Sequence, residues 1–150
     1  MHIQNQDAER YQNTKPHIYQ SPRKPRDQKQ RRGKIFDIRE RALYFSLRVI
    51  EISEALPKNM TYDIIRKQLI KSGTSIGANI EEADGGVSKR DFINKAAIAR
   101  KEARETKYWL RIINMRETEI ELDKEIQEVQ EIINILSTMI KNTKEPLEKK

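Results

Sequence analysis

The chain has no cysteine and only two histidines, His2 and His17, both in its polar N-terminal stretch. Without these side chains, disulfides, thiolate chemistry, zinc and haem sites and di-iron bundles lack their usual ligands. A serine nucleophile would likewise lack a nearby histidine base. No apolar run is long enough for a signal peptide or a membrane span. We therefore expect a cytoplasmic protein that is not an enzyme, holds no cofactor and has no membrane partner.

Glycine and proline are also scarce, with five of each in 150 residues, while charged residues make up 35%. This composition is typical of a helix-rich soluble protein. Apolar residues recurring every three or four positions predict helices over residues 37–56, 61–83, 88–114 and 123–141. Four amphipathic helices with short connections predict an all-α, antiparallel up-and-down four-helix bundle at residues 35–141. Residues 142–150 are expected to fray.

Local signals mark where these helices begin. Asp37 is a suitable N-cap for the first helix, and Asn59 or Thr61 for the second. Ser88, followed three residues later by Asp91, resembles a capping box for the third helix. Each signal supports the helix boundaries that the apolar spacing predicts.

The net charge of +7 is concentrated before the predicted bundle. Residues 1–34 hold nine basic and three acidic side chains, whereas the remaining residues hold 21 and 20. Ser21–Lys34, SPRKPRDQKQRRGK, is too polar to form a core and predicts a disordered basic tail. The tail is a nucleic-acid-binding arm that uses Arg31 and Arg32, or a solvated extension, or the result of an over-long start assignment.

A second set of basic residues lies in the predicted third helix. Arg100, Arg104, Lys107 and Arg111 follow one another at steps of four, three and four, so they share one face. This face either contacts a polyanion such as RNA or DNA, or pairs with the acidic fourth helix. The residues 117–150 hold nine acidic and five basic side chains, which gives the pairing alternative its force.

Two predicted helices carry more apolar surface than one core needs. On the first helix the surplus side chains are Leu43, Leu47 and Ile50. On the fourth they are Ile132, Ile135 and Met139. Large exposed apolar patches usually mark interfaces, so we expect a homo-oligomer.

The stretch Lys71–Ala83, KSGTSIGANIEEA, contains Gly73 and Gly77. Gly73 to Gly77 also fits G-x-S-x-G, a nucleophile elbow around Ser75, but that elbow needs a preceding strand and the run before it has helical spacing. We therefore predict a helix whose small side chains allow a neighbouring helix to approach its backbone closely. The acidic residues that follow, Glu81, Glu82 and Asp84, lack histidine partners and predict a solvated helix end rather than a metal site.

This stretch, together with SKRDFINKAAIARKEARETKYWLRII (Ser88–Ile113), resembles the four-helix-bundle proteins encoded in 23S rRNA intervening sequences. The same superfamily includes the accessory variability protein of diversity-generating retroelements. The resemblance covers roughly Phe36–Lys141 and leaves out the basic tail. The matching residues are Gly73, Ser75, Ile76, Asn79, Glu81, Glu82, Glu102, Glu105, Tyr108, Trp109 and Leu110.

The resemblance implies assembly into a five-fold barrel, that is, a pentamer. In retroelements the accessory protein binds nucleic acid and the reverse transcriptase, so it also implies those partners. Two functions therefore remain open for this chain. It is either a nucleic-acid-binding accessory factor, or an oligomeric scaffold that binds a protein partner such as a reverse transcriptase without contacting nucleic acid.

Overall fold

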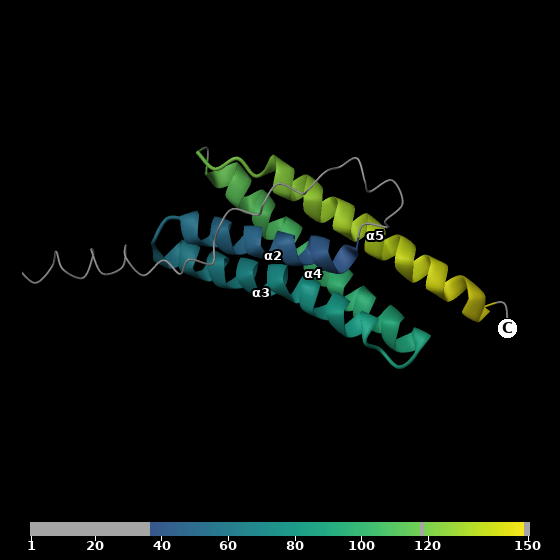
Figure 1. Cartoon of the computed structure of the whole chain (residues 1–150). Coiled ribbons are helices and arrows are strands. Elements are labelled where there is room, and N and C mark those ends of the chain that lie inside the picture. Colours follow the sequence, from purple (N-terminus) through teal and green to yellow (C-terminus); the bar gives the residue numbers. More distant parts are fainter. Residues whose placement is uncertain (1–36, 118, 149–150) are drawn as a thin grey trace, which may run out of the picture. The chain divides into compact units, whose positions relative to one another are not determined.

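The computed structural model describes residues 37–117 and 119–148. They form four helices and no strand: α2 (Ile38–Ala55), α3 (Met60–Asp84), α4 (Lys89–Arg116) and α5 (Asp123–Glu148). Short connections join the helices, and the chain runs up and down through them (Figure 1). The predicted all-α four-helix bundle is confirmed. The basic tail lies outside the described residues.

The helix starts follow the predicted caps. The Asp37 carboxylate accepts a hydrogen bond from the backbone N–H of Arg39 at 3.0 Å. Asn59, rather than Thr61, caps α3, since its side-chain oxygen accepts from the Tyr62 N–H at 3.0 Å. The Ser88 hydroxyl oxygen accepts from the Asp91 N–H at 3.1 Å. Each cap satisfies one N–H group that the first helical turn leaves unpaired.

The core runs the length of the bundle and takes side chains from all four helices. On α4 it consists mainly of small residues, Ala96, Ala99 and Ala103, followed by Thr106 and Leu110. The larger core residues outside α4 are Phe45, Val49, Ile52, Leu56, Tyr62, Ile65, Leu69, Ile76, Ile80, Leu122, Val129, Ile132, Ile133, Leu136 and Ile140. Small residues on α4 opposite bulky ones elsewhere keep the packing dense without widening the bundle.

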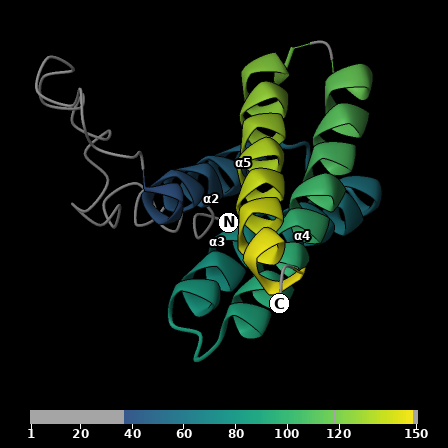
Figure 2. The same ribbon diagram turned by 90° about the vertical axis from the view of Figure 1, so that its right-hand side faces the viewer.

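α3 packs against both α2 and α4, and α4 also packs against α5. α4 and α5 stand side by side, and α2 runs obliquely behind α5 (Figure 2). Of the helix pairs in contact, α2 and α5 have the least extensive interface. Contacts between α2 and α5 are therefore made mainly by long side chains.

Gly73 allows α2 and α3 to approach closely. A Cβ at position 73 would lie 2.7 and 2.8 Å from the two methyl groups of Val49, so no side chain fits there without movement. A Cβ at Gly77 would lie 3.6 Å or more from Ser46 and Ala42, which is ordinary contact. The predicted close approach is thus confirmed at Gly73, whereas at Gly77 α2 lies at a distance that does not require glycine.

Two further predictions need correction on α5. The helix continues to Glu148, past the predicted end at Lys141 and through Pro146. Proline removes one backbone hydrogen bond, but its fixed φ is compatible with a helix, and only two helical residues follow it. Ile132, which was predicted as surplus surface, is fully buried. The core side of α5 is wider than a single row of apolar residues.

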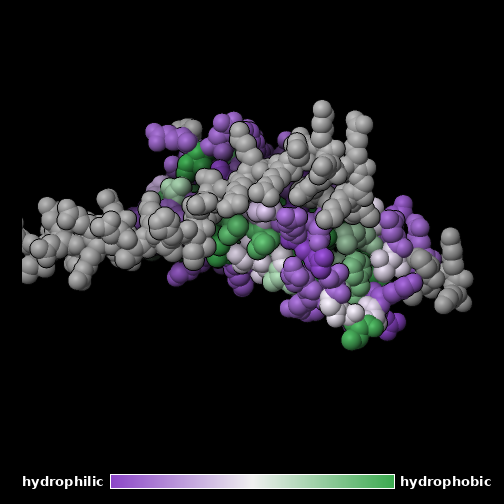
Figure 3. Space-filling view, viewed as in Figure 1, coloured by the Kyte–Doolittle hydropathy of each residue, from purple (hydrophilic) through white to green (hydrophobic). Residues whose placement is uncertain are grey.

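The surplus apolar surface on α2 is confirmed. Leu43, Leu47 and Ile50 are 59%, 39% and 37% exposed. They follow at steps of four and three and so share one face of the helix. The space-filling view shows green hydrophobic surface over α2 between purple polar groups (Figure 3). The described part of the chain contains no helix with the length and hydropathy needed to cross a bilayer.

Candidate functional site

The four basic residues of α4 form one stripe beside the core face of that helix, as their spacing predicts. Arg104 and Arg111 are exposed, whereas Arg100 and Lys107 are half-buried. From Arg100 to Arg111 the stripe is about 16 Å long at 1.5 Å per residue. We refer to Arg100, Arg104, Lys107 and Arg111 as the α4 stripe.

The half-buried members of the α4 stripe contact neutral groups on α5. The Arg100 guanidinium donates to the Ser137 hydroxyl at 3.3 Å, and the Lys107 ammonium donates to the Gln130 side-chain oxygen at 2.7 Å. Neither contact supplies a negative charge. Among the described residues, no side chain forms a hydrogen bond or ion pair with the Arg104 or Arg111 side chain. No carboxylate of the described residues therefore pairs with the stripe.

The α5 residues along this contact form a matching neutral ridge. Gln127, Gln130, Asn134 and Ser137 follow at steps of three, four and three, so they share one face. These two hydrogen bonds fix an antiparallel register between α4 and α5. In that register Asn134 falls level with Arg104, and Gln127 with Arg111. The carboxylates of α5 between Gln127 and Ser137 are Glu128, which pairs with Arg41 of α2, and Glu131, whose charge also acts on Arg41.

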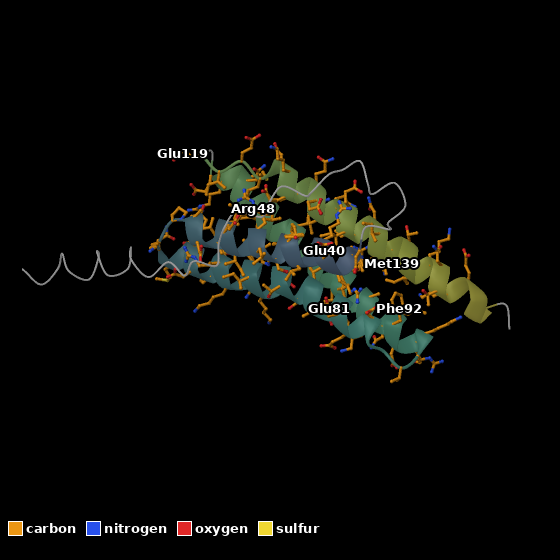
Figure 4. All side chains as sticks on the ribbon, viewed as in Figure 1. Glu40, Arg48, Glu81, Phe92, Glu119 and Met139 are labelled. Carbon is orange, nitrogen blue, oxygen red and sulfur yellow. The ribbon has the colours of Figure 1, made fainter. Side chains whose placement is uncertain are left out.

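Two glutamates of α5, Glu125 and Glu128, instead face α2. The Arg41 guanidinium donates to both carboxylate oxygens of Glu128, at 2.5 and 2.9 Å. The Arg48 guanidinium donates to Glu125 at 2.6 Å, and Arg48 lies on the side of α2 nearest α5 (Figure 4). Donating these hydrogen bonds to Glu128 and Glu125 raises the pKa of Arg41 and of Arg48 respectively. Glu125 and Glu128 therefore pair with cations of α2, and not with the α4 stripe as the pairing alternative predicted.

These ion pairs cross a groove of about 580 Å³ between α2 and α5. The groove is lined by Arg41, Tyr44, Phe45, Arg48, Lys124, Glu125 and Glu128. Arg41 pairs across it with Glu128, and Arg48 pairs with Glu125, whose side chain is only 11% exposed. These two ion pairs link α2 to α5.

The comparisons with known proteins agree with this fold. The model of the 23S rRNA-intervening sequence protein family matches residues 34–142. The chain belongs to this family. A search of curated proteins gives no match.

Among solved structures, one relative is a protein of unknown function from the S23 ribosomal protein family of Bacteroides thetaiotaomicron VPI-5482. It is 37% identical, with a TM-score of 0.64, and the match covers 69% of this chain and 98% of that chain. Neither the family description nor the description of this relative names a catalytic activity. Membership confirms the predicted resemblance to the intervening-sequence proteins.

The two alternative sites within Lys71–Ala83 do not form. The Ser75 hydroxyl lies inside α3 and donates to the Lys71 carbonyl at 2.6 Å, so there is no strand-to-helix elbow. Beyond it, Asp84 pairs with Arg39 and Glu82 pairs with Lys95. The described residues contain no group of three or more metal-ligating side chains.

Two features of the site were missed by the sequence reasoning. Tyr108 is 57% exposed between Arg104 and Arg111 on α4. Its position four residues after one arginine and three before the other is a signal that the sequence offers. For the neutral ridge, the sequence signal is the regular helical spacing of its uncharged polar residues. Arg31 and Arg32 lie outside the described residues.

Proposed function

We propose that this family member is a non-enzymatic, nucleic-acid-binding accessory protein that acts as a homo-oligomer. The observation that carries the proposal is the uncompensated α4 stripe, whose neighbours on α5 are uncharged amides and a hydroxyl. Arg and Lys at regular spacing contact successive phosphates, and side-chain amides add hydrogen bonds to sugar and phosphate oxygens. Repetition of the stripe in an oligomer would increase the affinity through avidity.

The stripe predicts binding that is electrostatic and falls steeply with salt. Replacing Arg104 and Arg111 together by glutamine should weaken RNA binding about tenfold at low salt and lower the salt slope by about 1.4, since each phosphate contact on a single strand contributes about 0.7. These two residues are preferred because Arg100 and Lys107 also hold α5. Fluorescence anisotropy of a labelled single-stranded RNA over a salt series measures both quantities.

The matched control removes two charges elsewhere. Lys67 and Lys71 are exposed and four residues apart on α3, so Lys67→Gln with Lys71→Gln makes the same charge change away from the stripe. Deletion of residues 1–34 separates the contribution of the tail, including Arg31 and Arg32. An equal loss in the α3 control would assign binding to net charge alone, and an absence of binding at low salt would exclude the proposal.

A second candidate is a homo-oligomeric scaffold that binds a protein partner, such as a reverse transcriptase, without contacting nucleic acid. The exposed apolar face of α2 favours it, because such a face is suited to contacts between proteins. A protein that forms oligomers but does not bind RNA or DNA at low salt would support this function over the first.

A further inference from the structure

Tyr108 presents an aromatic ring at the outer edge of the α4 stripe. It lies four residues after Arg104 and three before Arg111, so the three side chains share one face of α4. The tyrosine is 57% exposed and both arginines are exposed. An aromatic ring between two cations that have no side-chain partner in the described part of the chain differs from an aromatic residue that anchors a core.

The ring is also held in position. Its neighbour Trp109 meets it edge-on, with ring centroids 5.2 Å apart and an interplanar angle of 70°. Trp109 is half-buried against the core, and its indole N–H donates to Glu105 at 3.4 Å. A T-shaped contact with an anchored indole restricts the motion of the tyrosine ring. Binding to an already oriented ring costs less conformational entropy.

We propose that Tyr108 stacks on one unpaired base while Arg104 and Arg111 contact the phosphates on either side of it. The α4 stripe would therefore select single-stranded over double-stranded nucleic acid. This inference rests on the proposed function. Phosphates are accessible in both forms, but only an unpaired, unstacked base offers its face to a side chain. The ring thus supplies the discrimination that the charges lack.

A protein partner is the competing occupant of this ring. An apolar protein surface would have to cover Tyr108 and leave Arg104 and Arg111 at its rim. The adjacent cations favour a polyanion, because the ring and both charges can then be engaged together. The two occupants respond differently to loss of aromaticity at constant size, which the choice of variants exploits.

The test uses full-length protein, a short oligouridylate and an RNA duplex of equal length. Tyr108→Ala and Tyr108→Leu should each weaken single-strand binding about tenfold, since one stacked base is worth about that factor. Duplex binding should change less than about twofold, and the salt slope should not change because no charge is removed. Tyr108→Phe should restore single-strand binding.

Tyr44→Ala is the matched control, since Tyr44 is a similarly exposed tyrosine (48%) on α2. Trp109 is the only tryptophan in the chain, so its emission should change on binding in the wild type and in Tyr108→Phe. Full affinity of Tyr108→Leu, or equal loss on both substrates, would overturn the stacking proposal. If Arg104→Gln with Arg111→Gln still weakens binding in that case, the proposed function stands without it.

Discussion

Replacing Gly73 by alanine should destabilise the bundle by about 1–2 kcal/mol, and replacing it by leucine by about 3 kcal/mol. A Cβ at this position would lie within 2.8 Å of both methyl groups of Val49. Val49 is fully buried and β-branched, so it has no free rotamer into which it could move. The overpacking outweighs the gain of about 1 kcal/mol from replacing a helical glycine by alanine.

Gly77→Ala provides the matched control in the same helix. There the new Cβ would meet only ordinary contacts, so the gain in helix propensity should leave this variant as stable as the wild type or more stable by up to about 1 kcal/mol. Ser75→Ala should stay within about 1 kcal/mol of the wild type. Urea denaturation at fixed protein concentration compares all the variants, since oligomers change apparent stability with concentration.

A double-mutant cycle identifies Val49 as the cause. In a Val49→Ala background the two clashing methyl groups are gone, so Gly73→Ala should no longer be destabilising and should show a favourable coupling energy. An unchanged penalty in that background would mean that another neighbour of Gly73 sets the cost. Equal effects of Gly73→Ala and Gly77→Ala in the wild-type background would contradict the assignment of the close approach to Gly73.

The sequence predicted features that depend on local rules. Asp37 and Ser88 were identified as caps because a cap requires only a short polar side chain before a helical apolar pattern. The members of the α4 stripe share one face because helical spacing alone places them there. The four helices and their up-and-down order follow from the same periodicity together with short connections.

The predictions that were wrong concern the sides of helices, whose burial depends on which other helix packs beside them. Helical spacing marks Ile132 and Leu47 alike as off the main stripe, yet Ile132 is buried and Leu47 exposed. The difference arises because the core continues round α5, whereas this flank of α2 faces outward. Likewise, the sequence could not show whether the glutamates of α5 pair with α4 or α2. In the structure Glu128 pairs with Arg41 and Glu125 with Arg48, both on α2, so these carboxylates do not neutralise the α4 stripe.

Charge introduced on the exposed face of α2 should dissociate the protein into monomers. We propose that this face, formed by Leu43, Leu47 and Ile50, is buried between copies of the chain, with a pentamer implied by the resemblance. An interface based on a few buried apolar anchors cannot accommodate an unpaired carboxylate without a large desolvation cost. Leu43→Glu and Leu47→Glu should each reduce the mass measured by light scattering to that of one chain at micromolar concentration.

Ile64→Glu supplies a closely matched control for this experiment. Ile64 on α3 is 58% exposed, almost the same as Leu43 at 59%, but it does not belong to the α2 face. The same charge at position 64 should therefore leave the oligomer intact, and all variants should keep their helical circular dichroism because each site is already exposed. A wild-type monomer at micromolar concentration would refute the oligomer outright. Dissociation by Ile64→Glu alone would move the interface to α3, since the cost of a buried carboxylate is felt only where the partner covers it.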